Sequence, residues 1–107
     1  MATEHAIDAT EAIDRVAAGT VLIDVREQHE WDAGHAPRAT LLPMSEIEHR
    51  LGELPENGQF LVICHSGMRS ERVTNFLLSD GFDAVNVEGG MMAWQAAGGE
   101  ITTSDAA

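Results

Sequence analysis

The sequence predicts an α/β domain with a mainly parallel sheet and helices on both faces of the sheet. Two short apolar runs, residues 21–25 and 60–64, are continuous rather than alternating, which is typical of strands buried on both faces of a parallel sheet. Segments with helical spacing of apolar residues lie before, between and after these runs. The chain has 107 residues, of which 44% are apolar, so we expect one core and one domain over residues 1–98.

The first half of the chain contains two segments with helix start and stop signals. In residues 8–19, Asp8 is followed three positions later by Glu11, and a glycine closes the segment, which indicates a capped helix. Residues 45–54 show the same pattern, starting at Ser45 and stopping at a proline. We therefore expect a helix in each segment.

The second half of the chain predicts a helix, a strand and a further helix. The helix after the 60–64 run ends at Gly81 and has one apolar face, made of Val73, Phe76 and Leu77. Residues 84–87 predict a weaker strand, and residues 90–97 a short final helix. Residues 99–107 are mostly small and polar, so we expect a flexible tail there.

Charge and composition exclude several classes of partner. The chain has 18 acidic and 6 basic residues and a net charge of -12, a surface that repels nucleic acid and anionic membranes. No apolar run is long enough to cross a bilayer, the first residues do not form a signal peptide, and a single cysteine forms no internal disulfide, so we expect a cytoplasmic protein. His5, His29 and His49 lack metal-ligand spacing, and we expect neither a metal nor a cofactor.

The single cysteine, Cys64, lies where a parallel sheet places its functional residues. It ends the more apolar run and begins a loop that leads directly into a helix. Gly67 in that loop can adopt a positive φ, so the backbone N–H groups can turn toward the sulfur and favour the thiolate. The alternative is a small buried residue that ends a strand. We favour the nucleophile because a core cysteine has no need of a loop with a glycine, an arginine and a capping serine.

Three motifs in the chain carry a resemblance to a known family. They are Cys64-His65-Ser66-Gly67-Met68-Arg69-Ser70; Asp24-Val25-Arg26-Glu27 with the following Glu30-Trp31 and Gly34-His35-Ala36-Pro37; and Val87-Glu88-Gly89-Gly90-Met91-Met92-Ala93-Trp94. In this order, and over about Ile7 to Ala97, they resemble the rhodanese family of sulfurtransferases. Arg38 and Leu41 depart from the family pattern, in which a glycine and a polar residue are common.

The resemblance implies a five-stranded parallel sheet and a two-step sulfur transfer. A small anionic donor such as thiosulfate would pass its outer sulfur to Cys64, and the resulting persulfide would give that sulfur to cyanide, to a thiol or to a protein acceptor. The loop would bind the anion through His65, Ser66, Gly67, Met68, Arg69 and Ser70. Asp24, Arg26 and His35 would make structural hydrogen bonds and ion pairs near the site.

Some alternatives stay open from the sequence. Arg69 either attracts the donor, which we favour, or makes an ordinary ion pair, and His65 either contacts the acceptor or points to solvent. A cysteine phosphatase or arsenate reductase uses Cys-x5-Arg, whereas this loop has Cys-x4-Arg, which makes a cradle tight for phosphate. A rhodanese-like module that binds a protein or delivers sulfur with low activity of its own is the other alternative.

Overall fold

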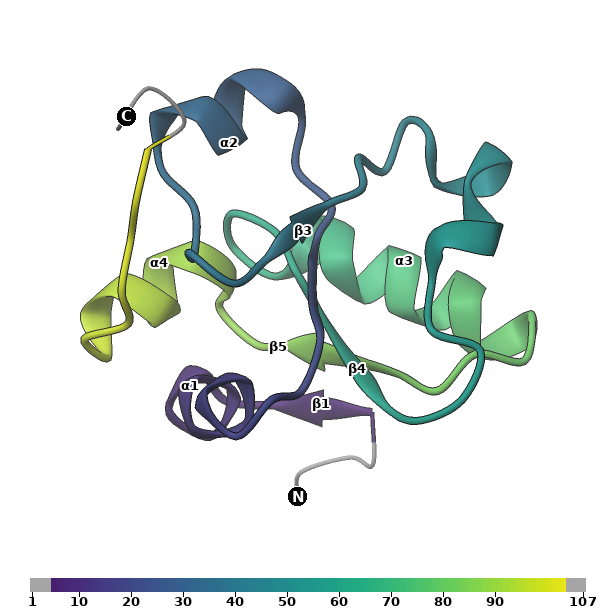
Figure 1. Cartoon of the computed structure of the whole chain (residues 1–107), viewed down its shortest axis with the longest axis horizontal. Helices are drawn as coiled ribbons and strands as arrows, with labels where there is room; N and C mark the ends of the chain where they lie inside the picture. The colour runs from purple at the N-terminus through teal and green to yellow at the C-terminus, as the bar shows by residue number, and fades with distance from the viewer. Residues whose placement is uncertain (1–4, 104–107) are drawn as a thin grey trace.

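The computed structural model describes residues 5–103, and within them five parallel strands form one sheet in the order β1-β5-β4-β2-β3 (Figure 1). The strands are β1 (Ala6–Ile7), β2 (Leu22–Asp24), β3 (Thr40–Leu41), β4 (Phe60–Ile63) and β5 (Ala84–Val87). The helices are α1 (Ala9–Ala17), α2 (Gln28–Ala33), α3 (Met68–Ser79) and α4 (Gly90–Ala96), with two short 3-10 turns, η1 (Ile47–His49) and η2 (Leu51–Glu53). The fold class predicted from the sequence is confirmed.

The sheet separates two hydrophobic cores, and β4 contributes to both. Leu61 and Ile63 face the core under α1 and α4, whereas Phe60, Val62 and the following Cys64 face the core under α3 and the 3-10 turns. All four residues of β4 are buried, as the continuous apolar run predicted. No helix in the described range is long and apolar enough to cross a membrane.

The capped helix predicted at residues 8–19 is confirmed. Asp8 is the N-cap of α1, and its side chain accepts a hydrogen bond of 2.9 Å from the backbone N–H of Glu11. Gly19 follows the helix with a φ of 109°, a left-handed conformation that glycine adopts without strain. The final helix predicted at residues 90–97 is also confirmed. α4 begins at the predicted residue and ends one residue earlier, at Ala96.

The helix predicted at residues 45–54 is wrong, because this segment forms the two 3-10 turns instead. The Ser45 hydroxyl does not cap a helix, because it donates a hydrogen bond of 2.9 Å to the Glu27 carboxylate. Gly52 is the middle residue of η2 and lowers the helix propensity of the segment. A cap pattern therefore failed here because a tertiary contact used the capping hydroxyl.

The apolar face predicted for the helix after Cys64 is correct at two of its three positions. Val73 and Leu77 are buried, but Phe76 is 36% exposed. The inner face of α3 is completed instead by Ser70 and Thr74, which are both buried. Ser70 lies on this face because its hydroxyl contacts the cysteine, whereas the buried hydroxyl of Thr74 has no hydrogen-bond partner among the described residues.

Residues 99–103 do not form the loose tail expected from their composition. Thr102 forms an antiparallel bridge with His35, with two backbone hydrogen bonds of 2.8 Å. The Trp94 indole N–H also donates to the Glu100 carbonyl at 2.9 Å. We call residues 99–103 the C-terminal strap; Figure 1 shows it in yellow, running from α4 toward α2. Residues 104–107 of the predicted tail lie outside the described residues.

Candidate active site

The loop around Cys64 begins where β4 ends and finishes in the first turn of α3. The turn depends on Gly67, which has a φ of 100° and precedes the helix. A side chain at this position would be strained, and its Cβ would lie 2.9 Å from the backbone nitrogen of Gly89. The glycine predicted to allow the turn is therefore required both by conformation and by space.

The sulfur of Cys64 is surrounded by hydrogen-bond donors from its own loop. The Gly67 N–H donates to Sγ at 3.1 Å, and the Ser70 hydroxyl lies 3.3 Å from Sγ. The residue is only 1% exposed. Burial raises the pKa of the thiol, but the hydrogen bonds from the Ser70 hydroxyl and from the N–H groups of Ser70, Gly67 and Ser66 outweigh it, so the pKa is lowered. The loop therefore favours a thiolate.

The first turn of α4 holds the loop from the other side. The Met91 N–H donates to the Cys64 carbonyl at 2.8 Å, and the Met92 N–H donates to the His65 carbonyl at 3.1 Å. A Cβ on Gly90 would lie 2.6 Å from the His65 carbonyl carbon, so only a glycine permits this approach. The motif at residues 87–94 thus positions the cysteine loop through its backbone.

Arg69 makes the ion pair that the sequence left as its alternative role. Its two terminal nitrogens each donate to the Glu30 carboxylate at 2.7 Å. The hydrogen bond from Arg69 is the largest cause that lowers the pKa of Glu30 to about 2, and partial burial opposes it. The same hydrogen bond raises the pKa of Arg69, and the charge of Cys64 contributes in the same direction, so the guanidinium lies within electrostatic reach of the sulfur. A contact with the donor stays a prediction.

The residues of the first motif form an internal network beside the loop. The Arg26 guanidinium donates to the Asp24 carboxylate at 2.8 to 3.1 Å and to the Gly34 carbonyl at 2.7 Å. The His35 ring stacks on Trp31 with centroids 3.6 Å apart. Asp24, Arg26 and His35 are all buried. These contacts tie the end of β2 to the segment after α2, whose His35 in turn bonds through its backbone to Thr102 of the C-terminal strap.

The cavity beside the loop has a volume of about 390 Å³ and contains residues that the sequence did not single out. It is lined by Arg26, Glu30, Ala33, Gly34, His65, Met91, Met92, Gln95 and Ile101. His65 connects this cavity to the cysteine, since it is the next residue in the chain. Ile101 reaches the cavity from the C-terminal strap, and no pattern in the sequence indicates that the strap returns to this place.

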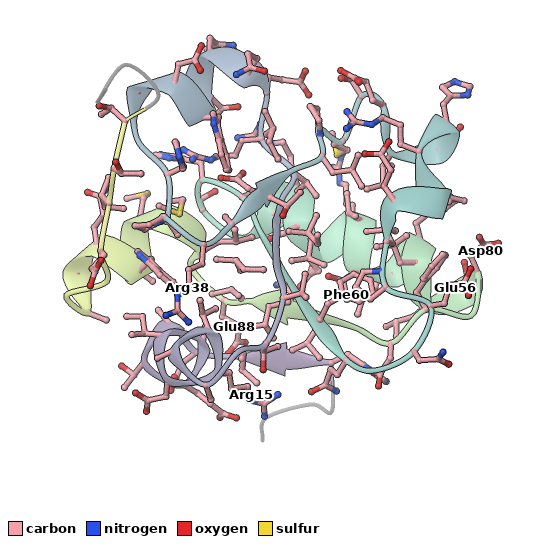
Figure 2. All side chains as sticks on the ribbon, in the orientation of Figure 1. Arg15, Arg38, Glu56, Phe60, Asp80 and Glu88 are labelled. Atoms are coloured by element: carbon pink, nitrogen blue, oxygen red, sulfur yellow. The ribbon has the colours of Figure 1, made fainter. Side chains whose placement is uncertain are left out.

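Arg38, which departs from the family pattern, points away from the loop. Its guanidinium donates to the carbonyls of Val16 and Ala17 at 3.2 and 3.5 Å, at the end of α1 (Figure 2). An arginine at a helix C-terminus satisfies carbonyls that have no partner within the helix. Within residues 5–103, no group of three or more histidine, cysteine, aspartate or glutamate side chains is placed to hold a metal ion.

The fold is a parallel α/β sheet, and its cysteine lies in a loop of N–H donors that favours the thiolate. These features are typical of proteins in which a cysteine thiolate reacts with small anions. Within that class, the family model described as "Rhodanese-like domain" matches residues 8–97, and the chain belongs to this family. It is a member of a family of sulfurtransferases, which confirms the resemblance found in the sequence.

Individual relatives agree with this assignment. YtwF of Bacillus subtilis (strain 168) is 46% identical over 74 residues, which cover 69% of this chain and 72% of that protein. The thiosulfate sulfurtransferase GlpE of Pseudoalteromonas translucida (strain TAC 125) is 32% identical over 72% of this chain and 74% of its own length. The crystal structure of a rhodanese-like domain protein from Staphylococcus aureus superposes with a TM-score of 0.82 at 36% identity and covers 92% of this chain and 99% of its own.

Proposed function

We propose that this protein moves a sulfane sulfur from thiosulfate, or from a similar small anionic donor, to cyanide or a thiol through a persulfide on Cys64. The observation that carries the proposal is the set of donors around Sγ: the Gly67 N–H at 3.1 Å and the Ser70 hydroxyl at 3.3 Å. These donors stabilise negative charge on sulfur without a metal, which both steps of such a transfer require.

Each step moves one sulfur atom and one electron pair. In the first step, the Cys64 thiolate attacks the outer sulfur of thiosulfate, a new S–S bond forms, and sulfite leaves with the electron pair of the broken bond. In the second step, cyanide attacks the outer sulfur of the persulfide, thiocyanate forms, and the Cys64 thiolate is released. With cyanide as the acceptor, no proton is taken up or lost in the sum, so the loop stabilises an anion throughout and needs no general base. A thiol acceptor attacks as its thiolate and leaves with the outer sulfur as a persulfide.

A phosphatase or arsenate reductase is less well supported by this loop. The arginine of Cys-x4-Arg is Arg69, and both of its terminal nitrogens are already bonded to the Glu30 carboxylate. Gly67 lies close to Gly89, so the cradle has little room to widen around a tetrahedral oxyanion. We therefore expect no hydrolysis of aryl phosphates above background in the wild type.

The acceptor in the cell is proposed to be a thiol, and two exposed side chains favour a thiol carried by a protein. Two large apolar side chains at the site are exposed: Met68 by 70% at the start of α3, and Met92 by 58% beside His65. Such side chains favour contact with a larger partner over contact with cyanide. A role in a reducing compartment such as the cytoplasm fits a chain with one free thiol.

The experiment that tests the function is mass spectrometry after treatment with thiosulfate. The wild type should gain one sulfur atom, which cyanide or a reductant should remove, and the Cys64→Ser variant should gain none and show no sulfur transfer. Circular dichroism of Cys64→Ser should match the wild type, because serine is close to cysteine in size. An unchanged wild-type mass with thiosulfate, polysulfide and glutathione persulfide would contradict the proposal.

The acceptor can be tested on the same persulfidated protein. Labelled sulfur should pass to a small protein with a reduced cysteine, about the size of thioredoxin, faster than to dithiothreitol at equal thiol concentration. Met92→Gln should slow the transfer to the protein and leave the transfer to dithiothreitol unchanged. Equal rates, unaffected by Met92→Gln, would favour a small-molecule acceptor.

A further inference from the structure

Asn86 is a polar residue in a strand that is buried at all four positions. It lies in β5 between Val85 and Val87 and is 5% exposed. An amide at such a position loses its hydrogen bonds to water and must find partners within the protein. Its side-chain Oδ1 accepts a hydrogen bond of 2.6 Å from the hydroxyl of Ser70, the last residue of the cysteine loop.

The Ser70 hydroxyl has two acceptors but only one hydrogen. Its Oγ lies 2.6 Å from Asn86 Oδ1 and 3.3 Å from Cys64 Sγ. A hydroxyl offers one donor and two lone pairs, so Ser70 donates well to only one of these neighbours at a time. When Cys64 is a thiol, its S–H can donate weakly to Oγ while Ser70 donates to Asn86. When Cys64 is a thiolate, the sulfur accepts only and competes with Asn86 for the Ser70 hydrogen.

An asparagine side chain can resolve this competition, because its two ends are nearly the same size. Half a turn about the Cβ–Cγ bond exchanges the carbonyl acceptor for the NH₂ donor with little change of shape. The NH₂ group then donates to Ser70 Oγ, and Ser70 is left to donate to the sulfur. The two hydrogen bonds point the same way and end at an anion, where such chains are strongest.

We propose that Asn86 is a positioning residue whose side-chain amide turns over when Cys64 ionises and thereby directs the Ser70 hydroxyl to the thiolate. The proposal rests on the proposed function only in that the thiolate is the nucleophile of sulfur transfer. Asn86 does not touch the reacting sulfur in this scheme and acts through Ser70. The orientation found in the structure, with Oδ1 toward Ser70, is the one that fits the thiol.

Other charged and titratable groups lie on the elements packed around the sulfur and have to be held constant. They are His65 in the loop; Arg69, Glu71 and Arg72 in α3; Glu30 in α2; the Asp24–Arg26 pair at the end of β2; and Glu88 after β5. The segments β4, β5 and α4 carry no charged residue. The variants below leave all of these groups in place.

The first test uses NMR on the protein with its natural Asn86. The Asn86 side-chain NH₂ resonances should move over the same pH range in which iodoacetamide reacts with Cys64, the only cysteine in the chain. In Cys64→Ser they should stay constant. Because a new charge also shifts nearby resonances through its field, Ser70→Ala is the deciding control: the movement should fall by at least about half when the connecting hydroxyl is absent. A movement of equal size in Ser70→Ala, or none in the wild type, would overturn the proposal.

The second test is a double-mutant cycle on the rate of alkylation at pH 7. The ionised carboxylate introduced by Asn86→Asp has the shape of the asparagine amide but only accepts, so it withholds the Ser70 hydrogen from the thiolate. We expect a rate about tenfold lower in the Ser70 background and at most about threefold lower in the Ser70→Ala background, where only the introduced charge acts. The same factor in both backgrounds would show that position 86 acts by charge and packing alone. Neither test uses a sulfur donor or acceptor, so its failure is distinct from failure of the proposed function.

Discussion

The starts of α3 and α4 use the same local device for different purposes. Each helix follows a glycine in the left-handed conformation, Gly67 with a φ of 100° and Gly89 with a φ of 78°, and neither has a side-chain cap. At α3 the free N–H groups point toward the Cys64 sulfur, whereas at α4 those of Met91 and Met92 bind the carbonyls of Cys64 and His65. One helix start thus turns N–H groups toward the cysteine sulfur, and the other holds the first in place.

A loop that stabilises charge on a cysteine sulfur needs a second element that holds its N–H groups in place. N–H donors that face a charge stabilise it best when they are fixed before the charge develops. The first turn of α4 supplies that rigidity from backbone atoms alone and carries no charged residue. The first turn of α3 adds Arg69 and Ser70, which affect the charge on the sulfur. Substitutions at the two helix starts should therefore differ in what they change.

The largest effect is expected from Gly90→Ala, which breaks the support at α4. Its Cβ would meet the backbone of the loop, 2.6 Å from the His65 carbonyl carbon, at a φ of 57°. We expect a loss of about 3 kcal/mol in the free energy of unfolding and at least about a hundredfold loss of sulfur transfer. Urea denaturation and the thiosulfate:cyanide assay measure the two effects.

Gly81→Ala is the matched control for that variant. Gly81 also has a positive φ, 90°, but a Cβ there meets nothing within 4 Å. The free energy of unfolding of Gly81→Ala should fall by about 1 kcal/mol from backbone strain alone, and its sulfur-transfer activity should be unchanged. If both alanine variants lost the same stability and the same activity, the close approach of α4 to the loop would not be needed for sulfur transfer.

The next effect is expected from Ser70→Ala, which removes a donor from the sulfur at the start of α3. The Ser70 hydroxyl is the largest of the contacts that lower the pKa of Cys64, so the pKa should rise in the variant. Sulfur transfer should fall about tenfold near pH 6, where less thiolate remains, and approach the wild-type rate at high pH. A pH profile with the same midpoint as the wild type would show that the hydroxyl serves Asn86 alone.

Two variants with opposite effects on the KM for thiosulfate, the larger of them similar in size to that of Ser70→Ala, should show whether Arg69 attracts the donor. Arg69→Ala should raise the KM for thiosulfate about tenfold, whereas Glu30→Gln should lower it about threefold because the guanidinium is released from its partner. Both values come from initial rates at low ionic strength, where screening is weak. An unchanged KM in both variants would leave the Arg69–Glu30 pair as a purely structural contact.

The smallest effect concerns the contribution of that pair to stability. Because the pKa of Glu30 is lowered from 4.5 to about 2 in the folded protein, its contribution is present above pH 4.5 and is lost as the pH falls toward 2. Glu30→Gln should be less stable than the wild type by about 1 kcal/mol at pH 7, after allowance for partial exposure, and the difference should shrink below pH 4.5. Urea denaturation at several pH values measures it. A difference that is constant with pH would have to come from packing.

Much of the fold was predictable because long, buried elements leave a strong pattern. The runs that became β2 and β4 are apolar without interruption, and the cap and glycine of α1 are local signals. The two-residue strands β1 and β3 are too short to leave any periodicity, and they were expected only through the resemblance to a family. The segment that became η1 and η2 had the cap signal but not the helix, because Ser45 bonds to Glu27.

The candidate site was predictable within one loop but not between elements. The left-handed glycine and the donors around Cys64 follow from seven adjacent residues. The partners that complete the loop are far away in the chain: Glu30 is 39 residues from Arg69, and Asn86 is 16 residues from Ser70. Glu30 belongs to the first motif and Asn86 directly precedes the third, but neither motif shows which residue each one contacts. Only packing of α2 and β5 against the loop brings them to Arg69 and Ser70.

The C-terminal strap bears on how this protein can be shortened or joined to another one. The family match spans residues 8–97. A protein cut at those limits would lose β1, which pairs with β5 at the edge of the sheet, and Ile101, which forms one wall of the cavity beside His65. It would also expose the His35 backbone, because both of its hydrogen bonds go to Thr102. For this chain, the smallest unit with an intact sheet edge and cavity wall runs from β1 to residue 102 or beyond, and a fusion on either side has to leave these residues in place.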